Sequence, residues 1–373
     1  METLLEIYDN ISKKEELYNY YHSNLNLSNA WHELDAAHSF ICGYFKNGEK
    51  DICKLQISND MYQPDIRDIH TVSVFILGIE IARKMKNRIL GNELFIWFLM
   101  CLYHDMGYKL ENKTDLVKEY YTLDKFLQKN EIKEEYNIFK VYKKKTLCKH
   151  YYRYRTKEKY RKKEHGVIKE HGVIDHGIAG GIILYNELVK NYYMVKEYSG
   201  SNEDSFEYSN RKFSKDNFKD YAKAAIGIIR HNMWYASDSD TCRTYYRFGL
   251  NDLISESNNK ICYTDDRLLF LLCLADTIEP LKNSDIKEYN KVLEGIYMDI
   301  ENINYQKNSK ITITIQVSDE LENKGKLIEN CLSLDSWMNV KTTQEDNKVK
   351  ITFSFQNKSI DDLKLKISQS AVR

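Results

Sequence analysis

Residues 94–109 read LFIWFLMCLYHDMGYK, an almost wholly apolar run that ends in the doublet His104-Asp105. A run this apolar predicts a helix in the protein interior. There, an imidazole and an ionised carboxylate cost free energy unless they are paired or bind a metal ion. We therefore expect the doublet to belong to a chemical site at the end of a core helix.

The composition indicates a mainly α-helical protein. The 373 residues include only two prolines and fifteen glycines, and apolar residues recur at helical spacing. The 55 lysines and arginines balance the 55 aspartates and glutamates, so the global charge indicates no class of partner. The cysteines form no CxxC pair, the first residues lack the layout of a signal peptide, and no apolar stretch reaches the roughly 18 residues that span a bilayer. We expect a cytoplasmic protein that makes no contact with a membrane.

The periodicity divides the chain into three parts. Residues 1–60 are expected to form N-terminal helices, over 2–22 and 29–46, that pack on the core. Residues 61–300 are expected to form a helical metal-binding domain, with a basic helical insertion at about 114–170.

After about residue 308 the pattern changes from helical to alternating. It predicts a strand, a helix and a hairpin over 310–317, 319–334, and 338–343 with 348–356. The last part, residues 308–373, is therefore expected to be a small α+β appendage in the order βαββ.

Two helices joined by a short connection bring the first candidate ligands together. A helix is expected from Pro64 to about Lys86, with His70 near its start, and the next helix covers 92–108. A short connection favours antiparallel packing, which places the start of the first helix beside the end of the second. His70 and the His104-Asp105 doublet are therefore predicted neighbours.

A second histidine-rich stretch covers residues 165–184. The near-repeat His-Gly-Val-Ile begins at His165 and again at His171, so His171 and His176 both stay open as candidate ligands. From Asp175 onward the pattern is that of a buried helix. His171 and Asp175 are four residues apart and could share a helix face, from which Asp175 could orient a histidine without touching a metal itself.

Two later helices repeat the pattern of polar groups within or ending an apolar run. The helix expected at 216–232 ends in Arg230-His231-Asn232, and Asp276 ends the apolar run of the helix expected at 263–282. One such residue alone is more often a hydrogen-bonded core residue than a ligand.

Together the chain offers six polar residues of this kind: His70, His104, Asp105, His176, His231 and Asp276. Imidazole and carboxylate without thiolate suit Mn, Fe, Co, Ni, Zn or Mg, and six groups suit two divalent ions bridged by one aspartate.

The strongest local charge lies in residues 140–163. This run holds twelve lysines and arginines and a single acid, Glu158, with five tyrosines between them. Basic side chains can bind phosphate while aromatic rings stack on bases, so the run could contact nucleic acid. The alternative is a solvated helix face or a disordered insertion.

The order His … His-Asp … His … His … Asp over residues 64–282 resembles the HD-domain superfamily of metal-dependent phosphohydrolases, in its five-motif, two-metal form. Residues 67–78 (RDIHTVSVFILG) resemble the first-motif helix of some bacterial members, and residues 176–184 (HGIAGGIIL) resemble their third-motif helix. The resemblance implies an HD-type helical bundle. The fourth motif lacks the paired histidines of the cyclic-dinucleotide classes and no Gly-Tyr-Pro follows Asp105, which argues against cyclic di-GMP as the substrate.

The resemblance also implies a role for each candidate residue. One ion would be held by four of them: His70, His104, Asp105 and Asp276. A second ion would be held by His176 and His231, with Asp105 as the bridge. Lys109 matches the position where several members place a lysine near the phosphate, and Arg67 and Arg230 are further candidates for binding the substrate. His171 and Asp175 would lie outside the ligand shell.

The implied activity is hydrolysis of a phosphoester or phosphoanhydride in a nucleotide-type small molecule or an oligonucleotide, by hydroxide that two metals activate. Two other functions use the same helices. One is an HD-type di-iron oxygenase that cleaves C–H or C–P bonds with O₂. The other is a regulatory module that binds a ligand or nucleic acid without turning it over.

Overall fold

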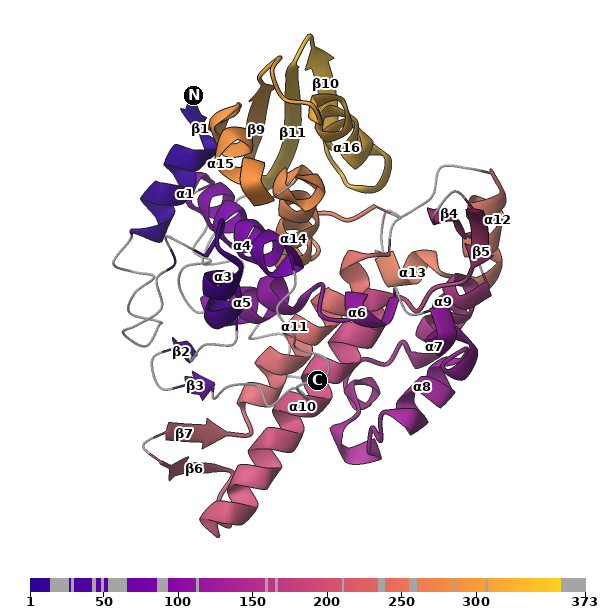
Figure 1. Ribbon diagram of the computed structural model, residues 1–373. Coiled ribbons are helices and arrows are strands. Elements are labelled where there is room, and N and C mark those ends of the chain that lie inside the picture. Colours follow the sequence, from indigo (N-terminus) through magenta and orange to yellow (C-terminus); the bar gives the residue numbers. More distant parts are fainter. Residues whose placement is uncertain are drawn as a thin grey trace.

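A computed structural model of the chain confirms a mainly α-helical protein with a small antiparallel sheet (Figure 1). The structure describes these residues: 1–13, 27, 30–41, 45–47, 50–52, 66–85, 93–111, 114–157, 160–164, 167–209, 211–233, 239–254, 260–284, 286–305 and 308–356. Within these ranges no helix is both long and apolar enough to cross a bilayer.

Five helices form the core: α4 (Ile66–Lys84), α5 (Leu94–Tyr103), α10 (His176–Ser199), α11 (Asn217–His231) and α14 (Arg267–Ile278). Every residue of α5 is buried, as its apolar sequence predicts. α5 packs against α4, α11 and α14, and α10 packs against α11. The rings of His70, early in α4, and His104, just after α5, are 5.4 Å apart, which confirms the antiparallel arrangement of these two helices.

Local chemistry determines where α10 begins and ends. The side chain of Asp175 accepts a hydrogen bond from the Ile178 N–H (2.9 Å) and caps the first turn. Gly200 ends the helix in the left-handed conformation (φ 66°), which glycine adopts without steric cost. His176 is therefore fixed as the first residue of a capped helix.

The N-terminal segment differs from the prediction at its start. Residues 2–3 form a short strand, β1 (Glu2–Thr3), and α1 (Leu4–Ser12) begins only afterwards, with Thr3 and Glu6 forming a capping box. α3 covers Leu34–Ile41, and both helices pack on α4. β2 (Phe45–Asn47) and β3 (Lys50–Ile52) form a small hairpin, and residues 14–26 lie outside the described part of the chain.

The segment expected as a helical insertion contains several short helices and a hairpin. They are α6 (Tyr108–Glu111), α7 (Thr114–Glu119), α8 (Leu123–Lys129), the 3-10 turns η3 (Glu134–Tyr136) and η4 (Ile138–Lys140), and α9 (Lys145–Lys157). The prediction of helix up to residue 170 is wrong at its end, because β4 (Tyr160–Glu164) pairs with β5 (Val167–His171). The charged residues of this stretch hide the alternation that would indicate a strand.

Two more regions follow this pattern of local hairpins and short helices. β6 (Ser205–Tyr208) and β7 (Arg211–Ser214) form a hairpin between α10 and α11. α12 (Ser239–Phe248) and α13 (Asn251–Ile254) lie between α11 and α14 in the chain. The turns η5 (Leu281–Asn283) and η6 (Ile286–Glu288) and the helix α15 (Tyr289–Glu294) follow α14.

The C-terminal sheet starts earlier than residue 308. Its members are β8 (Ile296–Tyr305), β9 (Asn308–Val317), α16 (Lys324–Trp337), β10 (Lys341–Glu345) and β11 (Lys348–Gln356), with strand order β1-β8-β9-β11-β10. The predicted order βαββ therefore lacks β8, whose inward residues Ile296, Met298 and Ile300 alternate with polar ones. Through β1 the N-terminus joins this sheet, at one end of the helical body (Figure 1).

Candidate metal centre

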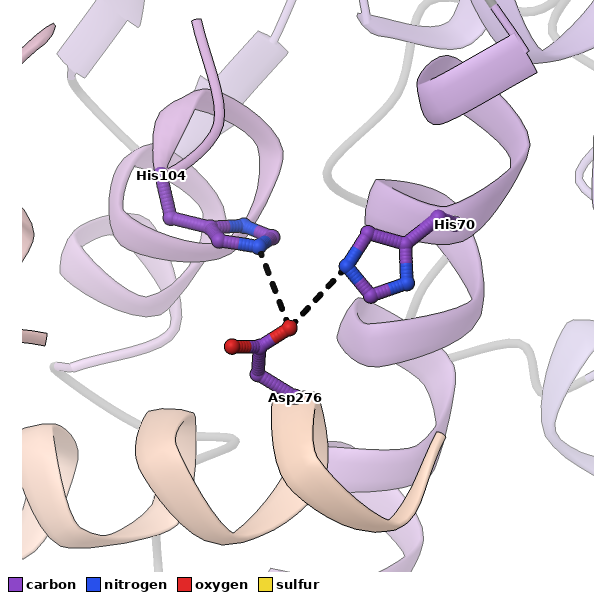
Figure 2. Close-up of side chains that lie close together, drawn as sticks. All are labelled: His70, His104 and Asp276. Atoms are coloured by element: carbon purple, nitrogen blue, oxygen red, sulfur yellow. Dashed lines mark ion pairs between the residues drawn. The ribbon is translucent and has the colours of Figure 1, made fainter. Parts of the chain in front are cut away.

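The ends of the core helices converge on one cluster of histidines and aspartates. All six predicted ligands belong to it. They lie at the start of α4, in the turn after α5, at the start of α10, and at the ends of α11 and α14. Figure 2 shows three of them, His70, His104 and Asp276, with their side chains pointing toward one another from three helical segments. Residues up to 206 positions apart thus meet at one place.

The spacing of donor atoms matches that of ligands on a common ion. Asp276 Oδ1 lies 3.0 Å from Nε2 of His70 and 3.6 Å from Nε2 of His104. Nε2 of His176 lies 3.2 Å from Nε2 of His231 and 3.5 Å from Asp105 Oδ1. Two ligands at right angles on an ion with bonds of about 2.1 Å are about 3.0 Å apart.

Two overlapping groups of side chains could each hold a metal ion. In one, donor atoms of His70, His104 and Asp276 lie within 4.8 Å of one another. In the other, the same holds for His104, Asp105 and His231. His176 completes the second group through its contacts with His231 and Asp105.

The outward nitrogen of each histidine is already occupied by an oxygen. Nδ1 of His70 lies 2.7 Å from Glu279 Oε2, and Nδ1 of His176 contacts the carboxylate of Glu111. Nδ1 of His104 and of His231 lie 2.7 and 2.6 Å from the backbone oxygens of Cys101 and Ile228. An N–H at each Nδ1 donates to these oxygens, so each imidazole turns Nε2 toward the centre as a potential ligand.

Two of these inward nitrogens lack a hydrogen bond in the described part of the chain. Nε2 of His70 and of His104 are buried and have no partner in hydrogen-bonding geometry. A buried polar atom without a partner costs free energy unless something else binds it. The donor set and these two atoms both fit a metal cation.

The electrostatics keep the carboxylates ionised. Burial raises the pKa of Asp105, but His104 and Arg67 outweigh it and hold the pKa well below the usual range. Burial likewise raises the pKa of Asp276, and Lys282 with His104 outweighs that effect. Both side chains are therefore ready to bind a cation as carboxylates.

Two of the histidines differ in their protonation. Burial lowers the pKa of His231 to about 3, with His176 and His104 adding to the effect, so this imidazole is neutral. Burial also lowers the pKa of His70, but Glu279 and Asp276 outweigh it and raise it to about 9. Metal binding by His70 must therefore displace a proton.

Three residues around the cluster were not predicted. Glu279, in the turn after α14, accepts hydrogen bonds from His70 and from Ser73 Oγ (2.6 Å). Glu111 on α6 contacts His176, and Lys282 Nζ lies 3.0 Å from Asp276 Oδ1. Only the spacing Asp276-x-x-Glu279 offers a local signal for any of them.

The predicted substrate-binding residues have different surroundings. Arg67 Nη1 donates to Asp105 Oδ2 (2.5 Å), and its guanidinium stacks on the Tyr108 ring, 3.2 Å from the centroid. Arg230 instead donates to the backbone oxygens of Leu253 (2.9 Å) and Ile254 (2.6 Å) and to Asp266, which favours a structural role for it. The side chain of Lys109 lies outside the described residues.

The second histidine stretch contributes His176 to the cluster. The side chain of His171, the other candidate, lies outside the described residues. Asp175 caps α10 and also accepts from Asn232 Nδ2 (3.1 Å), so it supports His176 by fixing the helix start.

Three of the five tyrosines of the basic run are packing residues. Tyr142, Tyr151 and Tyr152 are buried, and the Tyr151 and Tyr152 hydroxyls donate to backbone oxygens at 3.0 and 2.9 Å. These three rings cannot stack on bases, because they are buried in the core, Tyr151 and Tyr152 on the inward face of α9. The same helix directs Arg155 to Glu111, at 3.5 Å, so part of the basic run serves the surroundings of the cluster.

No protein-family model matches the chain, and searches of curated proteins and of solved structures find no significant match. The geometry of the cluster therefore carries the functional argument.

Proposed function

We propose that the protein is an HD-type, metal-dependent phosphohydrolase that acts on a nucleotide-type phosphoester or phosphoanhydride. The observation that carries the proposal is the inward orientation of four imidazoles. Their Nε2 atoms surround two ionised carboxylates at ligand spacing, while every Nδ1 has an oxygen partner. The order of these residues along the chain is the order found in the HD superfamily.

Two divalent ions in such a site polarise a phosphoryl oxygen and lower the pKa of water. In this proposal the ligands would divide between the two ions as the HD pattern implies, with Asp105 shared. The backing of the histidines agrees with this division. Each proposed ion receives one histidine backed by a carboxylate, His70 or His176, and one backed by a backbone oxygen, His104 or His231.

Arg67 is suited to bind the substrate beside the ions. Its guanidinium is fixed by Asp105 and by Tyr108, and its side chain stays partly exposed at the cluster. A fixed cation at this place stabilises negative charge that develops on phosphoryl oxygens. Lys109, four residues after Asp105 and directly after Tyr108, is a second candidate on sequence grounds.

Two alternative functions are tested by metal and ligand measurements. A di-iron oxygenase would contain tightly bound iron and consume O₂. A regulatory module would bind nucleic acid in a salt-dependent manner without hydrolysis in any metal. Tyr151 and Tyr152 of α9 are buried and cannot stack on bases, so they do not support nucleic-acid binding.

The test is a substrate screen with a matched variant. Nucleotides, cyclic dinucleotides and short oligonucleotides are incubated with Mn²⁺, Co²⁺, Ni²⁺ or Mg²⁺, and phosphate or nucleotide release is measured. His104→Ala removes a ligand and is expected to lower turnover by at least about a hundredfold while the circular dichroism spectrum stays helical. His150→Ala changes an exposed histidine outside the cluster and should retain the rate. Undiminished turnover in His104→Ala would contradict the proposal.

A further inference from the structure

The open side of the metal cluster is bordered by two cations. The side chains of His104 and Asp105 are 0% and 4% exposed, so they form the closed floor of the site. Asp276, Arg67 and Lys282 are 17%, 25% and 34% exposed. The solvent-exposed edge of the cluster therefore lies where Arg67, Asp276 and Lys282 are.

Both the backbone and the ammonium of Lys282 contact residues of the cluster. Its Nζ lies 3.0 Å from Asp276 Oδ1. Its backbone N–H donates to Glu279 Oε2 (3.0 Å), the same oxygen that lies 2.7 Å from His70 Nδ1. A single carboxylate thus positions a metal-ligand histidine and a lysine at the mouth of the site.

The partner of the lysine is itself a metal-ligand atom. Asp276 Oδ1 contacts Lys282 and also lies nearest to the inward nitrogens of His70 and His104. If Asp276 Oδ1 held a divalent cation, it would neutralise the ammonium less well, because the oxygen would share its charge with the metal. An anionic ligand at the open side would then replace Asp276 as the partner of the ammonium.

We propose that Lys282 is a substrate-binding residue of this site, with its ammonium on an anionic oxygen of a phosphoryl group, beside Arg67. The choice of a phosphoryl ligand rests on the proposed function. Arg67 and Lys282 differ in how firmly their side chains are held. Arg67 is held by a carboxylate and an aromatic ring, whereas the flexible side chain of Lys282 can move from Asp276 to the ligand.

The experiment measures ligand binding without turnover. Wild type, Lys282→Met and Lys282→Arg are loaded with Mn²⁺, their metal content is measured, and each is titrated with inorganic phosphate by calorimetry. Lys291→Met is the matched control, since Lys291 is an exposed lysine of the neighbouring helix α15. We expect Lys282→Met to bind phosphate at least about tenfold more weakly at equal metal content, because it loses a charge-assisted hydrogen bond. Lys282→Arg should recover most of the affinity, and Lys291→Met should match the wild type.

The outcomes separate this inference from the proposed hydrolysis. A loaded wild type that binds phosphate through Lys282 but cleaves no phosphoester would support the lysine and refute hydrolysis. Turnover with an unchanged KM and unchanged phosphate affinity in Lys282→Met would overturn the role of the lysine and leave hydrolysis standing. A variant that loses metal while its loaded fraction binds phosphate normally would show a structural role only, and a loaded wild type that binds no phosphate would also overturn the inference.

Discussion

At the candidate metal centre, the oxygen that contacts Nδ1 of each imidazole would influence how strongly that imidazole binds a cation. His70 and His176 are backed by the carboxylates of Glu279 and Glu111, while His104 and His231 are backed by backbone oxygens. A carboxylate increases the basicity of the ring more than a neutral carbonyl does. Competition between protons and metal is therefore expected to be strongest at the carboxylate-backed histidines.

The raised pKa of His70 predicts a pH-dependent stability of the metal-free protein. Its pKa is about 9 in the folded chain and about 6.5 in the unfolded chain. The protonated form therefore contributes about 3 kcal/mol of stability below pH 6.5, and this contribution is lost as the pH rises through 9. Denaturant titrations of chelator-treated protein between pH 6 and pH 9.5 measure the loss.

Glu279→Gln is the comparison for this pH dependence. It removes the charge that contributes most to the raised pKa of His70, so the fall in stability between pH 6.5 and 9 should shrink. An identical slope in wild type and variant would assign the pH dependence to other groups. The same protonation predicts that metal affinity of the wild type rises with pH over this range, because binding releases the proton of His70.

At the scale of elements, the turn after α5 packs directly against the backbone of the first turn of α10. Gly107 lies in the turn after the His104-Asp105 doublet, against the first turn of α10. A Cβ on Gly107 would lie 2.2 Å from the backbone oxygen of His176 and 2.8 Å from the Gly180 nitrogen. The absence of a side chain at Gly107 therefore allows the doublet to approach His176.

Gly107→Ala tests this close approach. Because the clash involves backbone atoms, α10 must move away from the doublet, and we expect a loss of about 1–3 kcal/mol or more in the free energy of unfolding, together with reduced metal content. Gly325→Ala is the control, since a Cβ there meets nothing within 4 Å. Denaturant unfolding and elemental analysis measure both effects, and a fully stable, metal-loaded Gly107→Ala would refute the packing argument.

At the scale of the whole molecule, a bound ion would crosslink distant parts of the chain. Its candidate ligands extend from His70 to Asp276, and hydrogen bonds continue outward from His70 through Glu279 and Ser73 to the Tyr8 hydroxyl on α1. α1 follows β1, which pairs with β8 of the C-terminal sheet. The centre is thus connected to both terminal segments of the described chain.

Metal removal should consequently destabilise the entire fold. An ion that binds only the folded state, at a concentration a thousandfold above its Kd, adds about 4 kcal/mol to the free energy of unfolding. We expect chelation to lower the Tm of the wild type and re-addition of Mn²⁺ to restore it. His104→Ala should show a much smaller response to both treatments, and an equal Tm shift in the two proteins would place the stabilising ion elsewhere.

Much of the candidate site could be predicted from local patterns. An apolar helix is recognisable from a few turns, and a histidine or aspartate within it or at its end is conspicuous because burying such a group is costly. His70, His104, Asp105, His231 and Asp276 all stood out for this reason, and the structure brings them together with His176. The order of the elements after residue 308 was predicted as well. The strand β8, which precedes residue 308, was missed although its buried residues Ile296, Met298 and Ile300 alternate with outward-facing ones.

The sequence by itself therefore determined the helical class and the donor groups, because burial and periodicity act over a few neighbouring residues. Tertiary structure alone decided which oxygen orients each imidazole. It likewise decided that Glu111 and Glu279 contact histidines of the cluster and that Lys282 contacts Asp276. It also decided that the tyrosines of α9 face the core. These relations join segments up to 209 residues apart, and their energies depend on distances that exist only after the helix ends have met.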